Sequence, residues 1–238
     1  MCGRYSITTP LEAIIQLFKV AERPNLRPRY NVAPTQMVPA VRLGDDGNRH
    51  LVELRWGLIP GWAKDSKIGY RMINARAETV REKPAFRSAF GRRRCLLAAD
   101  GFYEWQKTGN GKQPYRLCMD DGGPFAFAGL WEFWEGTGDE PAIESCSILT
   151  TDANDVAARV HNRMPVILDE ADFDAWLDGP AEAAAGLMRP YSGSRTMIAY
   201  PVDSRVGNVR NDDSALIEPL SEVDQDEPSD PDGQQSLL

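Results

Sequence analysis

The chain has 238 residues, 42% of them hydrophobic and 9% aromatic, and a formal net charge of −8. This length and composition predict a globular protein with a sizeable core, built as one large domain or two small ones. A membrane-spanning or secreted protein is excluded, because no apolar run is long enough and residues 1–20 lack a signal pattern, so we expect a cytoplasmic protein.

The charge is distributed unevenly along the chain. From Glu218 to the end there are seven acidic residues and no Lys or Arg, whereas residues 71–94 hold eight basic and two acidic residues. The net charge argues against a nucleic-acid partner, but the basic segment argues for one, although most such clusters are solvated helix faces. Residues 220–238 are acidic and poor in hydrophobic residues, so we expect a disordered tail after a domain at residues 1–219.

Three of the four cysteines have the features of core residues. Cys95, Cys118 and Cys146 lie in apolar, strand-like segments, which predicts reduced and buried thiols. The cysteines are far apart and form no C-x-x-C pair. Because only His50 and His161 could supplement them, we predict no metal site. We also expect no cofactor.

The first half of the chain contains signals for one helix and one hairpin. Thr9 has the features of a helix cap, with Pro directly after it and Glu12 three residues later, and predicts a helix over residues 10–19. Residues 38–43 and 51–56 are typical of strands joined by a Gly- and Asp-rich turn.

The remaining elements are short helices and apolar strands. Residues 74–79 are predicted to open a short helix that ends before Pro84, and residues 85–90 to add another turn. Strands are expected at 94–99, 101–105, 115–119, 125–133, 144–151, 166–168 and 197–202, helices at 154–160, 169–177 and 181–188, and a loop at 204–211. We therefore expect one α+β domain, whose mainly antiparallel sheet curls into a partial barrel with helices outside.

Cys2 has unusual chemistry if Met1 is removed, because it then carries an amine and a thiol on adjacent carbons. These groups titrate near ~8 and ~8.5, so both are partly nucleophilic at neutral pH. A 1,2-aminothiol condenses with an aldehyde to a thiazolidine ring, and it can also attack an acyl carbon with its own amine as base. A cysteine at position 2 also occurs without any function, so the dipeptide alone favours no activity.

Two tryptophans lie in a loop rich in Gly and Pro. We expect Trp56, at a strand end, to pack in the core, and Trp62 to be the better candidate for a ligand contact. An exposed aromatic side chain beside basic residues can stack on an unpaired base. Such stacking stabilises binding by roughly 1–3 kcal/mol per base.

Two ionisable residues are candidates for proton transfer. Glu104 lies among aromatic residues, so its carboxylate is either on the solvent face of a strand or in an apolar pocket that raises its pKa. His161 lies at a predicted helix end in a polar loop, where catalytic groups are often found, although a lone His is structural in most proteins.

Four separated stretches resemble the signature blocks of the SRAP domain, the SOS-response-associated peptidase family of abasic-site-processing proteins. They are Met1-Cys2-Gly3-Arg4-Tyr5, residues 73–78 around Asn74, residues 100–105 around Glu104, and His161-Asn162-Arg163-Met164-Pro165. Residues 30–34, 56–62 and 206–209 also look like family blocks. The resemblance runs from Cys2 to about Pro219 in the family's order.

This resemblance implies a sensor that covalently traps abasic sites in single-stranded DNA through a thiazolidine at Cys2. Asn74 would hydrogen-bond near the terminal amine, Glu104 would assist proton transfer there, and His161 would contact the opened deoxyribose and shuttle a proton. Self-processing at Met1 and a strand-cleaving lyase activity would accompany capture.

The resemblance also implies a DNA-contacting set. Arg4, Arg76 and Arg163 would grip phosphates, and Trp62 would stack on the DNA. Ala63 follows where a second Trp can occur, so stacking on that side is expected to be weaker. We expect a monomer that binds single-stranded DNA and no membrane.

Three other interpretations stay open. An N-terminal-nucleophile hydrolase such as a glutamine amidotransferase also begins with Met-Cys-Gly, but it leaves the basic segment and the later blocks unexplained. A papain-like protease could use Cys2, His161 and Asn74. A plain nucleic-acid-binding module would need no nucleophile.

Overall fold

The computed structural model describes residues 2–109 and 111–221. From residue 222 on, the predicted acidic tail lies outside the described residues, so its disorder stays a prediction. Among the residues described, no helix is long and apolar enough to cross a bilayer.

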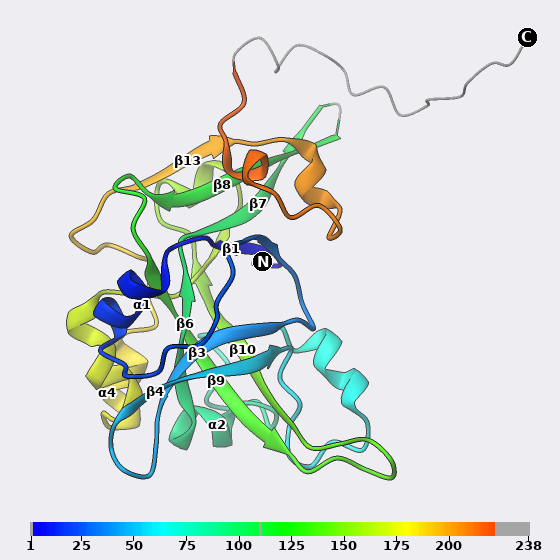
Figure 1. Cartoon of the computed structure of the whole chain (residues 1–238), viewed down its shortest axis with the longest axis vertical. Helices are drawn as coiled ribbons and strands as arrows, with labels where there is room; N and C mark the ends of the chain where they lie inside the picture. Colours follow the sequence, from blue (N-terminus) through cyan, green and yellow to red (C-terminus); the bar gives the residue numbers. More distant parts are fainter. Residues whose placement is uncertain (1, 110, 222–238) are drawn as a thin grey trace, which may run out of the picture.

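The centre of the fold is a closed barrel of five strands (Figure 1). The strands are β3 (Met37–Leu43), β4 (Arg49–Trp56), β6 (Arg94–Ala99), β9 (Phe125–Trp134) and β10 (Ile143–Asp152). Neighbours pair antiparallel in the order β4-β3-β6-β9-β10, and a parallel pairing of Ser145 with Arg55 returns β10 to β4. A closed ring leaves no edge strand, so the barrel is complete where a partial one was predicted.

A second, antiparallel sheet lies above the barrel in Figure 1. Its order is β13 (Met197–Pro201), β8 (Gly111–Met119), β7 (Gly101–Thr108), β1 (Tyr5–Ile7) and β2 (Arg29–Val32). Three short strands extend the barrel: β5 (Asn74–Arg76) and β11 (Arg163–Pro165) pair with β10, and β12 (Ile167–Leu168) pairs with β9. The prediction of an α+β fold with a mainly antiparallel sheet is confirmed.

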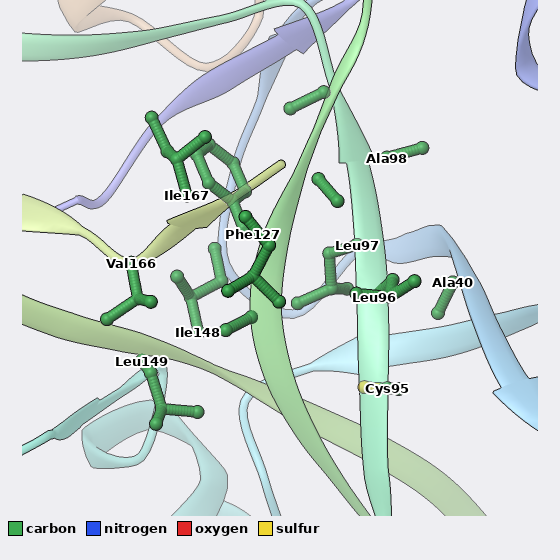
Figure 2. Packing of buried hydrophobic residues seen from close by; sticks show 14 of the residues in the cluster. Ala40, Cys95, Leu96, Leu97, Ala98, Phe127, Ile148, Leu149, Val166 and Ile167 are labelled. Atoms are coloured by element: carbon green, nitrogen blue, oxygen red, sulfur yellow. The ribbon is translucent and has the colours of Figure 1, made fainter. Parts of the chain in front are cut away.

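The barrel core is apolar because its strands carry nearly continuous hydrophobic runs. Figure 2 shows Phe127 of β9 with Leu97 of β6 and Ile167 of β12, and both pair with Phe127 across the sheet. Each such buried side chain stabilises the fold by about 1.5–3 kcal/mol. Cys95 and Cys146 are free and fully buried here, which confirms the prediction of core thiols, and Cys118 is likewise free and buried on β8.

The helices are short and peripheral, as predicted (Figure 1). They are α1 (Leu11–Phe18), α2 (Arg87–Arg92), α3 (Phe173–Leu177) and α4 (Ala181–Gly186), with 3₁₀ turns η1 (Ser66–Arg71), η2 (Ala157–Arg159), η3 (Glu170–Asp172), η4 (Ser204–Gly207) and η5 (Ser214–Ile217). Phe18 stacks on Phe173 with ring centroids 5.4 Å apart, which joins α1 to α3.

Three local predictions were wrong. The segment that begins at Asn74 is strand β5 rather than a helix, because its backbone pairs with β10 from Ile148 to Thr150. Such long-range pairing outweighs local propensity. The helix expected at 154–160 is only the single turn η2, and the loop expected at 204–211 begins with η4.

The predicted cap of α1 was also wrong. The helix forms, but its N-cap is Pro10, which has no capping side chain. The carboxylate of Asp100 accepts hydrogen bonds from the backbone N–H groups of Thr8 and Thr9 instead. The Asp100 side chain, directly after β6, thus fixes the segment that leads into this helix.

One strained residue gives a first prediction. Thr35 has φ 74°, in the left-handed region that costs a β-branched residue about 1–2 kcal/mol. Its backbone N–H donates to the Trp56 carbonyl at 2.7 Å, which keeps it in this conformation. Thr35→Gly is expected to raise the free energy of unfolding by about 0.5–1 kcal/mol, after allowing for the greater freedom of unfolded Gly. Urea denaturation checks this, and a lower midpoint for the variant would contradict it.

Candidate active site

The segment that begins at Cys2 is held by strands β7 and β5. Cys2 lies just before β1, which pairs with β7, and the N–H of Tyr103 donates to the Arg4 carbonyl at 3.0 Å. The Asn74 side chain on β5 donates from Nδ2 to the Cys2 carbonyl at 2.8 Å. The Asn74 Oδ1 atom is buried and has no hydrogen-bond partner among the described residues. Asn74 therefore ties the amino-terminal segment to the end of the barrel.

The Cys2 thiol is buried beside the Glu104 carboxylate. Cys2 has no exposed surface, and burial raises the pKa of its thiol, with a further increase from the negative charge of Glu104. Glu104 is 4% exposed, and burial raises the pKa of its carboxyl, whereas the nearby His161 lowers it. The thiol is thus protonated at neutral pH, with a carboxyl group of raised pKa close by.

His161 reaches this cluster from the loop between η2 and β11. Its backbone N–H donates to the Ala157 carbonyl at 2.8 Å, and the Arg163 N–H donates to its Nδ1 at 3.0 Å. The Arg163 carbonyl lies 3.3 Å from the same Nδ1 atom, so the backbone of Arg163 fixes the orientation of the imidazole ring.

The structure thus brings together the four residues predicted as catalytic, although they come from four separate segments of the chain. Asn74 contacts Cys2, Cys2 interacts with Glu104, and Glu104 interacts with His161. The structure also has a cavity of 160 Å³ beside Ile14 and a cavity of 280 Å³ beside Phe173. None of these four catalytic candidates lines either cavity. The Cys2 thiol is closed to solvent.

The residues predicted to contact DNA lie in different environments. The Trp62 side chain is 61% exposed, whereas Trp56 is fully buried and its Nε1 donates to the Ile73 carbonyl at 2.9 Å, as the sequence predicted. Arg76 is exposed on β5, directly after Asn74 and Ala75. Trp62 and Arg76 are accessible to a ligand.

The other two arginines are already bound within the protein. Arg163 forms ion pairs with Glu78 at 2.5 Å and Asp152 at 2.9 Å, and Glu78 raises the pKa of Arg163. Arg4 donates from Nη1 to the Asn31 Oδ1 at 2.9 Å. Their contacts with phosphates stay a prediction. In the structure, each guanidinium group binds other residues of the protein.

Part of the basic segment at 71–94 is used for structure. Arg94 is 6% exposed and donates to the carbonyls of Phe90, Trp176 and Gly179. Arg93 pairs with Glu132 at 2.7 Å. Fewer basic side chains of this segment are therefore available to a nucleic acid than its net charge indicates.

A polar network that no sequence pattern predicted supports β1, the strand after Cys2. Asp100, at the end of β6, accepts from the Ser6 hydroxyl at 2.6 Å and pairs with Arg116 at 3.2 Å. Both side chains of this ion pair are nearly fully buried. Asp100 is the first residue of the block around Glu104, but no local pattern indicated that its partners are Ser6 and Arg116.

The fold and the site define a class of protein in which a closed barrel and a second sheet bury the amino-terminal segment. In this protein that segment brings Cys2 together with Asn74, Glu104 and His161. The chain belongs to the SOS response associated peptidase (SRAP) family, whose model matches residues 1–209.

Relatives and solved structures agree with this assignment. The abasic site processing protein YoqW of Bacillus subtilis (strain 168) is 41% identical over 225 residues, which cover 92% of this chain and 99% of that protein. The abasic site processing protein HMCES of Gallus gallus is 32% identical, over 82% of this chain and 67% of that protein. A crystal structure of a Bacteroides thetaiotaomicron protein has a TM-score of 0.82 and 26% identity, covering 92% of this chain and 100% of that one.

The buried carboxyl of Glu104 gives a second prediction. Since burial raises its pKa in the folded state, its contribution to stability is present below the unfolded pKa of about 4.3 and is lost as the pH rises through the folded value. Glu104→Gln is therefore expected to melt at a higher temperature than the wild type at pH 8, with a smaller difference near pH 5. Thermal unfolding at both pH values tests this.

The exposed Glu53 supplies the control for this measurement. Glu53→Gln changes the charge equally but should leave the melting temperature nearly unchanged at both pH values. A lower melting temperature of Glu104→Gln at pH 8 would show that the charged carboxylate stabilises the fold.

Proposed function

We propose that this protein processes abasic sites in single-stranded DNA by forming a covalent cross-link through Cys2 after Met1 has been removed. The observation that carries the proposal is the cluster around the second residue of the chain, where Asn74 holds Cys2 and the Glu104 carboxyl lies beside its thiol. An abasic site in its open form is an aldehyde, the electrophile that a 1,2-aminothiol captures best. The names of the relatives support the same substrate.

The proposed chemistry has two bond-forming steps. The Cys2 amine attacks the aldehyde carbon, and loss of one water gives an imine. The thiol sulfur then attacks the same carbon, the thiol proton passes to the ring nitrogen, and a thiazolidine results. In this proposal Glu104 takes the thiol proton and returns it to nitrogen, a role supported by the rise that burial causes in the pKa of its carboxyl.

The other residues have supporting roles in this proposal. Asn74 orients the terminal residue through its carbonyl. His161 contacts the deoxyribose and shuttles a proton from its C1′ hydroxyl to its ring oxygen as the sugar ring opens. The imine is also the species that β-elimination requires, so lyase activity is part of the proposal. So is removal of Met1 by the chain itself, in keeping with the family's description as a peptidase.

We assign DNA binding to the exposed Trp62 and Arg76 first. Trp62 can stack on a base, and Arg76 lies on β5, two residues after the Asn74 that binds the Cys2 carbonyl. Arg4 and Arg163 would contact phosphates with whichever donors their internal partners leave available.

The test uses single-stranded DNA with one abasic site and a denaturing gel. We expect a shifted protein–DNA band with this DNA, and none with a tetrahydrofuran analogue, which cannot open to an aldehyde. The same shift with both DNAs would refute capture through an aldehyde. Hydrolysis of glutamine without DNA, and no shifted band, would support the amidotransferase interpretation instead.

A further inference from the structure

Asn31 joins two distant parts of the chain through one carboxamide. It lies on β2 and is 2% exposed. Its Oδ1 accepts from Arg4 Nη1 at 2.9 Å, and its Nδ2 donates to the carbonyls of Asn208 at 3.0 Å and Asn211 at 2.8 Å. The amino-terminal segment and the segment at 206–211 are therefore bound to the same side chain.

Arg4 is fixed through both its side chain and its backbone. Its guanidinium also donates to the carbonyls of Val206 at 2.7 Å and Gly207 at 3.1 Å. Its carbonyl accepts from the Tyr103 N–H at 3.0 Å. Because Arg4 is two residues after Cys2, its position limits where the thiol and the terminal amine can lie.

This anchoring matters most when Cys2 is the end of the chain. Terminal residues are poorly ordered unless they are tied down. Strand β1 begins only at Tyr5, so strand pairing within β1 does not reach Cys2. We propose that Asn31 is a positioning residue for the Cys2 nucleophile and acts through Arg4. This inference rests on the proposed function, because it concerns the same reaction.

The test replaces the carboxamide and separates binding from chemistry. Asn31→Ala removes an acceptor from Arg4 and the donors to segment 206–211. Because displacing a reacting group by about 1 Å can cost about 10²-fold, we expect the capture rate at saturating abasic DNA to fall at least about 10-fold. Affinity for the tetrahydrofuran DNA should stay within about twofold, since DNA-binding side chains are not replaced.

A second readout distinguishes positioning from reactivity. The rate at which the terminal aminothiol condenses with a small soluble aldehyde should be unchanged in Asn31→Ala, because a freely diffusing aldehyde needs no fixed geometry. Asn31→Asp keeps an acceptor for Arg4 and is expected to capture DNA faster than Asn31→Ala. If Asn31→Ala does not fold, Asn31→Asp can be compared with the wild type in the same assay.

Gln113 offers a matched control. Its carboxamide donates to the Val202 carbonyl at 2.9 Å, just before the same C-terminal segment, and none of its hydrogen bonds involves Arg4. Gln113→Ala should therefore capture DNA at the wild-type rate even if its melting temperature falls.

Three results would overturn the inference. They are a wild-type capture rate in Asn31→Ala, a slow rate that excess DNA restores, and an Asn31→Asp rate as low as that of Asn31→Ala. The wild type is measured in the same assay. If it forms no cross-link, the proposed function fails, which is distinguishable from a failure of the role of Asn31.

Discussion

Cys2→Ala is expected to form no covalent adduct with abasic single-stranded DNA. Alanine keeps a terminal amine but has no thiol, so an imine that forms cannot close to a thiazolidine and hydrolyses again. A variant with one glycine inserted before Cys2 is expected to lose the adduct as well, because the amine and thiol then no longer lie on adjacent carbons. The measurement is the fraction of DNA shifted on a denaturing gel, with intact mass to identify the amino terminus.

Two controls show whether the loss is chemical. Cys118→Ala removes a different buried thiol and should retain the cross-link. Cys2→Ala should still bind tetrahydrofuran DNA as the wild type does. A stable adduct formed by Cys2→Ala would contradict the proposed chemistry.

The burial of Cys2 adds a condition to this prediction. Because the Cys2 thiol is closed to solvent, the proposed reaction requires that removal of Met1 opens the site to DNA. A soluble thiol reagent should therefore alkylate Cys2 faster in the processed protein than in a preparation that retains Met1. Equal and slow rates in both forms would contradict the proposed access of DNA to Cys2.

Of the substitutions considered for this protein, Asp100→Ala is expected to lower the free energy of unfolding the most. Asp100 accepts from Ser6 and from the segment that begins α1, and it pairs with Arg116. Removing one member of a buried ion pair leaves an uncompensated charge and costs about 3–5 kcal/mol. For a domain of this size that corresponds to a decrease of roughly 10 °C in the melting temperature.

An exposed ion pair supplies the comparison for this measurement. Asp121 pairs with Arg195 at the surface, where its side chain is 52% exposed. Asp121→Ala is expected to cost about 1 kcal/mol or less, since solvent screens such pairs. Equal losses in the two variants, measured by urea denaturation, would show that burial of Asp100 adds nothing.

Much of the site could be proposed from the sequence because its residues lie in recognisable local blocks. Cys2, Asn74, Glu104 and His161 were each placed in such a block, and the structure brings them together. Asn31 lies in a recognised block too, but its hydrogen-bond partners could not be predicted. Nothing near it in the sequence shows that its partners are Arg4 and the carbonyls at 206–211.

The amino-acid order was enough to predict the helix α1, the β3–β4 hairpin and the apolar strands of the barrel, because hydrophobic periodicity and turn residues act over a few positions. It could not show that Asn74 begins a strand, that β10 closes the ring against β4, or that Arg4 and Arg163 are bound internally. Those features depend on groups brought together from far along the chain, such as Asn74 and Cys2. Long-range pairing and burial decide them, since local preferences are worth less than the contacts that the folded chain makes.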